Sequence, residues 1–303
     1  MYPTVIPNKI SFIWVGPSLP ERYGVNIFTW AEANPQYEVY LWTEQFNIHT
    51  NAKLIVDAYL HSVDSDPASQ ISIYDTFDGV MVNITMSGRS PVQIFVNSIG
   101  LLTPLLDPSL LMEELTVWKN YGTTSDILRF WVVNHIGGIY MDLDTFMKVI
   151  SPLPLNIYAP RGILFAEVLD GHKLTMATPI VASSQGHLTL RKISLAIEQT
   201  YNKEYPQVGH GAREFAEQNQ QRLQAVIDLR RTMKREIAEQ GKVSIFTDAE
   251  FGLFFVASTL SRGGGWMHHI DPREVNDAVV LEYSFQEQAD YEVIIDNDST
   301  WKK

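Results

Sequence analysis

Residues 123–144 constrain the fold of this chain more than any other part of its sequence. They begin with Thr-Thr-Ser-Asp, continue through a largely apolar segment and reach two consecutive glycines. Threonine or serine can accept a hydrogen bond from a free amide at the start of a helix, and glycine suits the left-handed residue that ends one. We therefore expect a buried helix over residues 126–136, capped by Thr124 or Ser125.

Two charged side chains interrupt the apolar part of this predicted helix. Asp126 and Arg129 are three residues apart, so they share one helix face. A buried helix does not need such a pair for solubility. The pair therefore indicates a functional role.

The residues after the two glycines are typical of a strand, predicted over residues 139–144. The two-residue period of a strand places Tyr140, Asp142 and Asp144 on one face. Carboxylates this close repel each other unless a metal ion or hydrogen bonds compensate. Mn2+ and Mg2+ prefer oxygen ligands and can neutralise a leaving diphosphate. A lone Asp-x-Asp is usually a solvated turn, but in this setting it predicts a metal-diphosphate site.

Composition excludes several classes of protein. The formal net charge of −12 argues against a nucleic-acid binder, which needs a basic surface. The absence of cysteine excludes a disulfide framework, a thiolate metal site and a cysteine nucleophile. No apolar run approaches the length of a membrane span, and the N-terminus lacks the layout of a signal peptide. We expect a globular chain without a transmembrane segment.

The first part of the sequence is typical of a nucleotide-binding α/β half. A strand is predicted over residues 9–15, a helix over residues 26–33 and a second strand over residues 37–42. A Gly-Pro pair closes the first strand and opens a loop. The fold class we expect is therefore α/β.

Two later regions are predicted to be helical insertions. Apolar spacing favours helices over residues 45–60 and 92–118, with polar, turn-rich sequence between them. A highly charged helix is expected within residues 198–241. We expect one domain over residues 1–303, with helical insertions at about 45–120 and 198–241.

The run Ser-Asp-Ile-Leu-Arg at residues 125–129, followed by Gly-Gly-Ile-Tyr-Met-Asp-Leu-Asp at residues 137–144, resembles the DxD sugar-binding region of GT-A glycosyltransferases. The similarity is to the large clostridial glucosylating toxins and related bacterial effectors. It extends to Ile-Trp-Val-Gly at residues 13–16 and to the ending Asp-x-x-Ser-x-Trp at residues 296–301. The resemblance implies a GT-A fold with a Rossmann-like nucleotide-binding sheet.

The resemblance also implies a set of site residues. A nucleotide and sugar site is implied at Trp14, Ser125, Asp126, Arg129, Tyr140, Asp142, Ser299 and Trp301. A cation site is implied at Asp142, Asp144, Asp296 and Ser299. The groups implied in catalysis are Asp126, Arg129, Asp142 and Trp301.

The implied roles within this set are specific. Trp14 stacks on uracil, and such base stacking is worth roughly 1–3 kcal/mol. Ser125 holds the nucleoside and Tyr140 supports the nucleotide. Asp126 and Arg129 bind hydroxyls of the donor sugar.

At the reacting end of the donor, Asp142 contacts the sugar or ribose. Asp144, Asp296 and Ser299 hold the cation. Trp301 reaches the scissile sugar-phosphate oxygen. These roles follow from the resemblance alone.

The implied reaction transfers a hexose or N-acetylhexosamine from a UDP-sugar, such as UDP-glucose or UDP-GlcNAc, with Mn2+ or Mg2+ and with retention. The implied acceptor is a Ser, Thr or Tyr hydroxyl of a host protein, a Rho-family GTPase by resemblance. No carboxylate stands out as a covalent nucleophile, so we expect front-face attack in which the leaving diphosphate takes the acceptor's proton. A protein of this kind is secreted or injected and acts in the host cytosol.

The helical membrane-binding segment that precedes the first strand in the clostridial toxins is absent. We therefore expect either the catalytic domain of a larger toxin or a stand-alone effector.

Two alternatives stay open. A transferase that builds glycans, of the fungal mannosyltransferase type or for bacterial surface polysaccharide, shares the DxD region, although the Ser-x-Trp ending favours the toxin group. The second alternative is an inactive module that binds sugar nucleotides. The intact Arg129, Asp142, Asp144 and Trp301 argue against it. The sequence identifies neither the donor sugar nor the acceptor residue.

Overall fold

The fold is described from a computed structural model of the chain. It describes residues 4–62, 65–112, 115–116, 121–160, 162–170, 173–188, 190–191, 193–194 and 284–295. The chain divides into two compact units. The first unit comprises residues 1–103, 131–187 and 281–303, and the second comprises residues 104–130 and 188–280.

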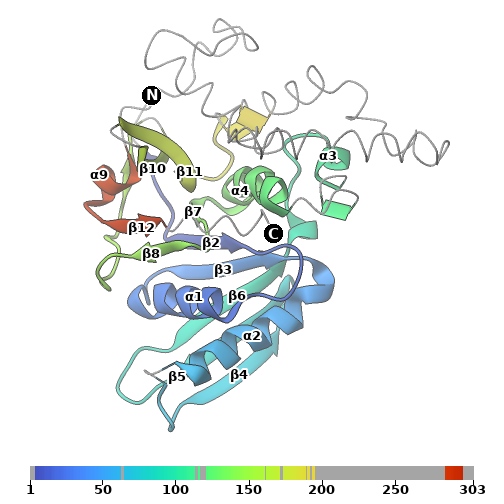
Figure 1. The fold of residues 1–303 in the computed structure, drawn as a ribbon, viewed down its shortest axis with the longest axis vertical. Coiled ribbons are helices and arrows are strands. Elements are labelled where there is room, and N and C mark those ends of the chain that lie inside the picture. The colour runs from blue at the N-terminus through green and yellow to red at the C-terminus, as the bar shows by residue number, and fades with distance from the viewer. Residues whose placement is uncertain are drawn as a thin grey trace, which may run out of the picture. The chain divides into compact units, whose positions relative to one another are not determined.

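An eight-stranded mixed sheet forms the first unit, in the order β10-β11-β7-β2-β3-β6-β5-β4 (Figure 1). Its strands are β2 Lys9–Ile13, β3 Glu38–Thr43, β4 Gln70–Asp75, β5 Gly79–Thr85, β6 Val92–Ser98, β7 Gly138–Met141, β10 Ile163–Asp170 and β11 Lys173–Ser183. The central strands β7, β2, β3 and β6 pair in parallel, and the outer strands pair antiparallel. This parallel centre confirms the predicted α/β class with a Rossmann-like sheet.

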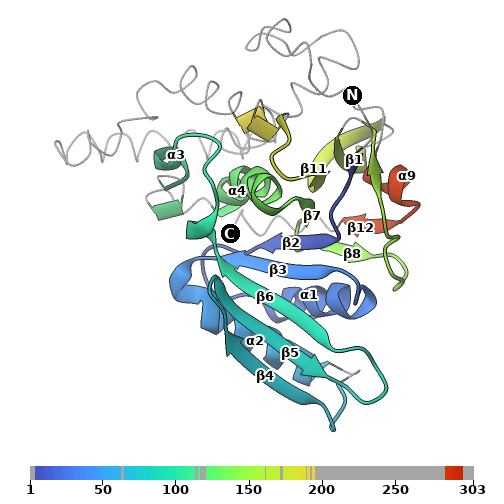
Figure 2. The same cartoon turned by 180° about the vertical axis from the view of Figure 1, so that it is seen from behind.

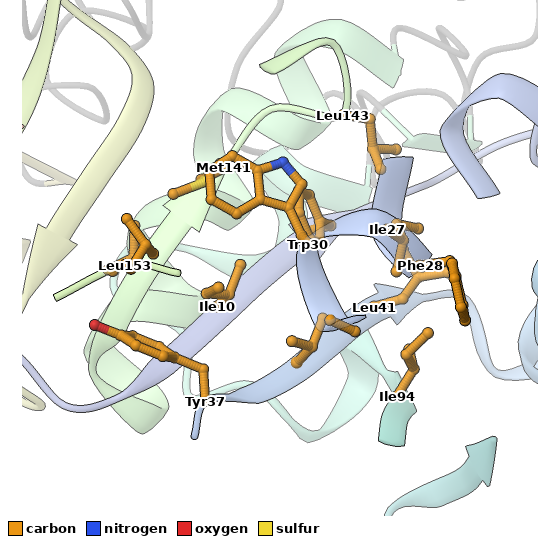
Figure 3. Packing of buried hydrophobic residues seen from close by; sticks show 14 of the residues in the cluster. Ile10, Ile27, Phe28, Trp30, Tyr37, Leu41, Ile94, Met141, Leu143 and Leu153 are labelled. Atoms are coloured by element: carbon orange, nitrogen blue, oxygen red, sulfur yellow. The ribbon is translucent and has the colours of Figure 1, made fainter. Parts of the chain in front are cut away.

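Helices α1 (Glu21–Ala33) and α2 (Ile48–His61) cover one face of this sheet. Figure 2 shows strands β4, β5 and β6 in front of the two helices. The helices pack closely because Gly24 has no side chain: a Cβ there would lie 2.8 Å from Ala58 Cβ. The core between sheet and helices contains Ile10, Ile27, Trp30, Leu41 and Met141, all fully buried (Figure 3). Burial of this apolar face gives the sheet its stability.

The turn after α1 is tied to the loop at residues 151–157. Asn34 Oδ1 accepts the amide of Leu153 at 2.6 Å. The Tyr37 hydroxyl donates to Pro154 O at 2.7 Å. Burial raises the pKa of Tyr37 to about 12, because the phenolate would lose its hydration.

Helix α4 (Tyr121–Ile136) is longer at its start than the sequence predicted. Thr124 and Ser125 lie inside the helix, so the prediction that one of them caps it was wrong. Its end is as predicted: Gly137 has a φ of 68° and donates its N–H to Val133 O at 2.9 Å. The second glycine is also required, since a Cβ on Gly138 would lie 2.6 Å from Lys9 O.

Short elements complete the described chain. They are β1 Thr4–Val5 paired with β9 Tyr158–Ala159, β8 Thr145–Met147 paired with β12 Val293–Ile295, α9 Phe285–Ala289, α3 Pro108–Met112, η1 Gln45–Asn47 and η2 Ile99–Leu101. In the described ranges, none of the helices combines the length and the apolar character needed to cross a membrane.

The predicted helical insertion at residues 45–120 is only partly helical. Residues 45–60 form η1 and α2, as expected. The helix predicted over residues 92–118 was wrong at residues 92–98, which form the central strand β6, whereas residues 108–112 form the short helix α3. Strands β4 and β5 were not predicted either. The second insertion, at residues 198–241, lies outside the described residues.

Candidate active site

The two DxD carboxylates follow the end of the buried strand β7. The strand stops at Met141, earlier than predicted, because Asp142 enters a turn closed by Thr145 N–H donating to Asp142 O at 2.9 Å. Asp142 N–H also donates to Pro179 O of β11 at 2.8 Å. Both carboxylates are partly exposed, whereas the strand that delivers them is buried. Hydrogen bonds therefore fix the backbone of Asp142, while the residues of the carboxylate pair stay partly exposed.

Tyr140 supports the first carboxylate directly. Its ring is buried, and its hydroxyl donates a hydrogen bond to Asp142 Oδ1. The sequence predicted that these two side chains share a face, and the structure brings them together. A donor fixed in the core restricts the orientation of the Asp142 carboxylate.

Helix α1 supports the second carboxylate through two buried donors that the sequence did not reveal. Asn26 Nδ2 donates to Leu143 O at 3.0 Å and to Thr145 O at 2.9 Å. Trp30 Nε1 donates to Thr145 O at 3.0 Å. These acceptors flank Asp144 on both sides. The available signal was a polar Asn on the apolar face of a predicted helix.

Strand β12 approaches the same segment. Its Ile295 is the register partner of Thr145, and Val293 is the partner of Met147. The predicted site residues Asp296, Ser299 and Trp301 follow β12 but lie outside the described residues. Within the part of the chain that the structure describes, no group of three or more His, Asp or Glu side chains could hold a metal ion.

Trp14 lies in the loop after β2. Strands β2 and β7 are parallel neighbours, so Trp14 and Asp142 follow their strands at the same edge of the sheet. The Trp14 amide donates to Trp42 O at 2.9 Å, and its indole Nε1 donates to Pro17 O. The ring is partly exposed and lies 5.7 Å, between centroids, from the ring of Tyr23. Two hydrogen bonds therefore fix Trp14 at the sheet edge, with its ring partly exposed.

Asp126 and Arg129 form the predicted pair, in the part of α4 that belongs to the second unit. Arg129 Nη2 donates to Asp126 Oδ1, and the two side chains are only 3% and 8% exposed. The neighbouring Ser125 is partly buried. The helix therefore presents a buried, charge-assisted hydrogen bond rather than a solvated pair.

Comparison with known proteins gives a family match. Residues 20–156 match the family described as "Glycosyltransferase sugar-binding region containing DXD motif". Subversion of eukaryotic traffic protein A of Legionella pneumophila is 30% identical over 196 residues, which are 65% of this chain and 26% of that protein. The chain thus spans about a quarter of the length of this relative.

The solved structures similar to this chain include two glycosyltransferase or toxin domains. The PaToxG glycosyltransferase has a TM-score of 0.45 and 16% identity, over 84% of this chain and 87% of the other. The catalytic domain of alpha-toxin from Clostridium novyi has a TM-score of 0.47 and 14% identity, over 68% and 60%. The family match confirms the predicted resemblance: residues 20–156, which contain Asp142 and Asp144, match the DXD-containing sugar-binding region of glycosyltransferases.

Proposed function

We propose that this chain is a glycosyltransferase of the bacterial toxin and effector type, with a UDP-sugar as donor. The observation that carries the proposal is the DXD family match over a segment whose two carboxylates emerge, partly exposed, from a buried parallel strand. The donor sugar is a hexose or N-acetylhexosamine, as in UDP-glucose or UDP-GlcNAc. A single GT-A domain over residues 1–303 is part of the proposal.

The donor nucleotide is held at the carboxyl edge of the sheet. Trp14 stacks on the uracil base, for which its partly exposed ring is suited. Ser125 and Tyr140 contact the nucleoside and nucleotide. Asp126 and Arg129 bind sugar hydroxyls, and their mutual hydrogen bond orients both groups for that contact.

A divalent cation, Mn2+ or Mg2+, fits the donor set of this edge. Asp142 and Asp144 supply hard carboxylate oxygens from a turn that hydrogen bonds hold at both sides. Asp296 is proposed as a further ligand because it directly follows Ile295, the partner of Thr145, in the sequence. Ser299 completes the set. The bound cation supplies charge neutralisation for the leaving diphosphate.

Transfer proceeds with retention by front-face attack. Asp142 orients the sugar or ribose, held in turn by the Tyr140 hydroxyl. Trp301 donates its indole N–H to the sugar-phosphate oxygen as negative charge develops there. The acceptor's proton passes to the leaving diphosphate.

The acceptor is a Ser, Thr or Tyr hydroxyl of a host protein, and a Rho-family GTPase is the proposed target. The protein acts in the host cytosol after secretion or injection. A relative named for the subversion of eukaryotic traffic supports a host target.

The test incubates the chain with UDP-glucose or UDP-GlcNAc, Mn2+ or Mg2+ and a lysate of host cells. The proposal expects one protein to gain the mass of the sugar, and Asp142→Asn with Asp144→Asn is the inactive control. Extension of a soluble glycan with no modified protein would favour a glycan-building transferase. UDP binding without hydrolysis or transfer would indicate an inactive binding module.

A further inference from the structure

A buried carboxylate with no role so far, Glu44, lies beside the loop that carries Trp14. Gly16 donates its amide N–H to Glu44 Oε1 at 2.8 Å. Asn47 Nδ2 donates to Gly16 O at 3.1 Å and to Glu44 Oε2 at 3.3 Å. Residues Glu44 and Asn47, in the segment that joins β3 to α2, therefore hydrogen-bond both the N–H and the C=O of Gly16.

The Glu44 carboxylate is held by neutral donors. Thr43 Oγ1 donates to Glu44 Oε2 at 3.3 Å, and Asn51 Nδ2 donates to Thr43 Oγ1 at 2.9 Å. Thr43, Glu44 and Asn51 are all buried. Among the described residues, no Lys or Arg forms an ion pair with Glu44. Three donors, from Gly16, Thr43 and Asn47, therefore hold the two carboxylate oxygens of Glu44.

The loop fixed in this way is short and closed. Trp14 is two residues before Gly16, and its indole donates to Pro17 O immediately after it. Gly16 has a φ of 102°, a conformation that other residues rarely adopt. A change in the hold on Gly16 therefore moves the Trp14 ring, because only one residue separates them.

We propose that Glu44, together with Asn47, is a positioning residue that fixes residues 14–17 so that the Trp14 ring is already placed for the uracil base. This inference rests on the proposed function. A loop that is ordered before the nucleotide arrives loses less conformational entropy on binding. The clamp, defined as Glu44 and Asn47 around Gly16, therefore contributes to recognition of the base and not of the diphosphate.

The test compares Glu44→Gln with Glu38→Gln. Glutamine keeps the shape of Glu44, but its NH2 group must face either the Gly16 amide or the donors from Asn47 and Thr43, so one contact becomes repulsive. Glu38 is the first residue of β3, the strand that ends next to Glu44, and its side chain is 53% exposed, which makes it a matched control. Calorimetry measures the affinity for UDP and for inorganic pyrophosphate, each with Mn2+. Hydrogen exchange of the nucleotide-free protein reports protection of the Gly16 amide.

In Glu44→Gln we expect faster exchange at Gly16 and about tenfold weaker UDP binding, equal to about 1.4 kcal/mol. Pyrophosphate affinity stays at the wild-type value, and Glu38→Gln behaves as wild type throughout. If Glu44→Gln does not fold, Asn47→Ala removes one arm of the clamp and is expected to weaken UDP, but not pyrophosphate, about threefold.

The outcomes separate the clamp from the proposed function. If wild-type protein and Glu44→Gln bind UDP equally well, the clamp alone is overturned. Equal weakening of UDP and pyrophosphate also overturns the clamp, since it points to general loss of structure. Wild-type protein that binds no UDP overturns the donor assignment and the clamp together.

Discussion

Replacing Arg129 by lysine tests whether the buried pair of α4 serves the donor. The side chains of Arg129 and Asp126 are 3% and 8% exposed, so their contact is shielded from water. Removing one partner of a buried pair costs about 3–5 kcal/mol, which is the expectation for Arg129→Ala. Lysine keeps the charge but loses the planar fork, so we expect Arg129→Lys to lose about 1–2 kcal/mol of unfolding free energy.

The effect of Arg129→Lys on turnover is expected to be larger than its effect on stability. Because one ammonium cannot bond to Asp126 and to two sugar hydroxyls in the geometry of a guanidinium, transfer falls at least about a hundredfold, or about 2.7 kcal/mol of barrier. Thermal melting followed by circular dichroism measures stability, and hydrolysis of the UDP-sugar measures turnover.

The matched control is Arg89→Lys. Arg89 pairs with Glu32 at the surface, where the side chains are 53% and 28% exposed. Exposed pairs contribute about 0–1 kcal/mol, so this variant is expected to match wild type in both measurements. If Arg129→Lys is as active and as stable as Arg89→Lys, the donor role of the buried pair is refuted.

Further predictions concern the cation, the C-terminal tryptophan and alkaline stability. Asp142→Asn with Asp144→Asn should abolish transfer with an unchanged melting temperature; wild-type turnover would contradict the metal site. Calorimetry should show weaker UDP binding after a chelator removes the divalent cation. Equal UDP affinity with and without Mn2+ would count against the proposed metal site. Trp301→Ala should lower kcat far more than it raises the Kd for UDP, because its contact strengthens in the transition state; a loss confined to UDP affinity would disprove this. Burial raises the pKa of Tyr37 to about 12, so the protonated Tyr37 contributes fully to the free energy of unfolding below pH 10, and this contribution is lost as the pH rises towards 12. In chemical denaturation, Tyr37→Phe should therefore lose less stability than wild type between pH 10 and pH 12. Identical losses would show that Tyr37 does not contribute.

The parts of the fold that could be predicted are those set by local chemistry. The two glycines at residues 137–138 predicted the end of α4 because each needs a conformation or an approach that excludes a side chain. The apolar run at residues 9–15 predicted β2. A strand buried on both faces is largely apolar, and such a run is recognisable when turn residues close it.

The mistaken helix over residues 92–118 shows where local pattern fails. In β6, Val92, Ile94 and Val96 face the core, and Phe95 is partly buried on the other face. Apolar residues spaced in this way satisfy a helical pattern and a strand pattern alike. Only the neighbours of β6 in the sheet decide between the two.

In the site, too, contacts between residues close in sequence could be predicted, and contacts between distant residues could not. Tyr140 and Asp142 share a strand period, so their proximity could be predicted from spacing alone. Asn26 and Glu44 could not be found in this way, because they act on segments far from them in sequence. Their roles depend on tertiary packing.

The pairing of β8 with β12 has a consequence for the order in which the protein folds. Thr145 and Ile295 are about 150 residues apart, so the entropic cost of closing this loop must be met before the pair forms. During synthesis β8 emerges long before its partner, and β7 meets β2 much earlier. We therefore expect the central sheet to form on the growing chain. The turn with Asp142 and Asp144 is first held by Asn26 of α1, and it gains the neighbouring β8–β12 pairing only after residue 295 has been made. Full organisation of this turn is a late event, which delays its maturation in the cell that makes the protein.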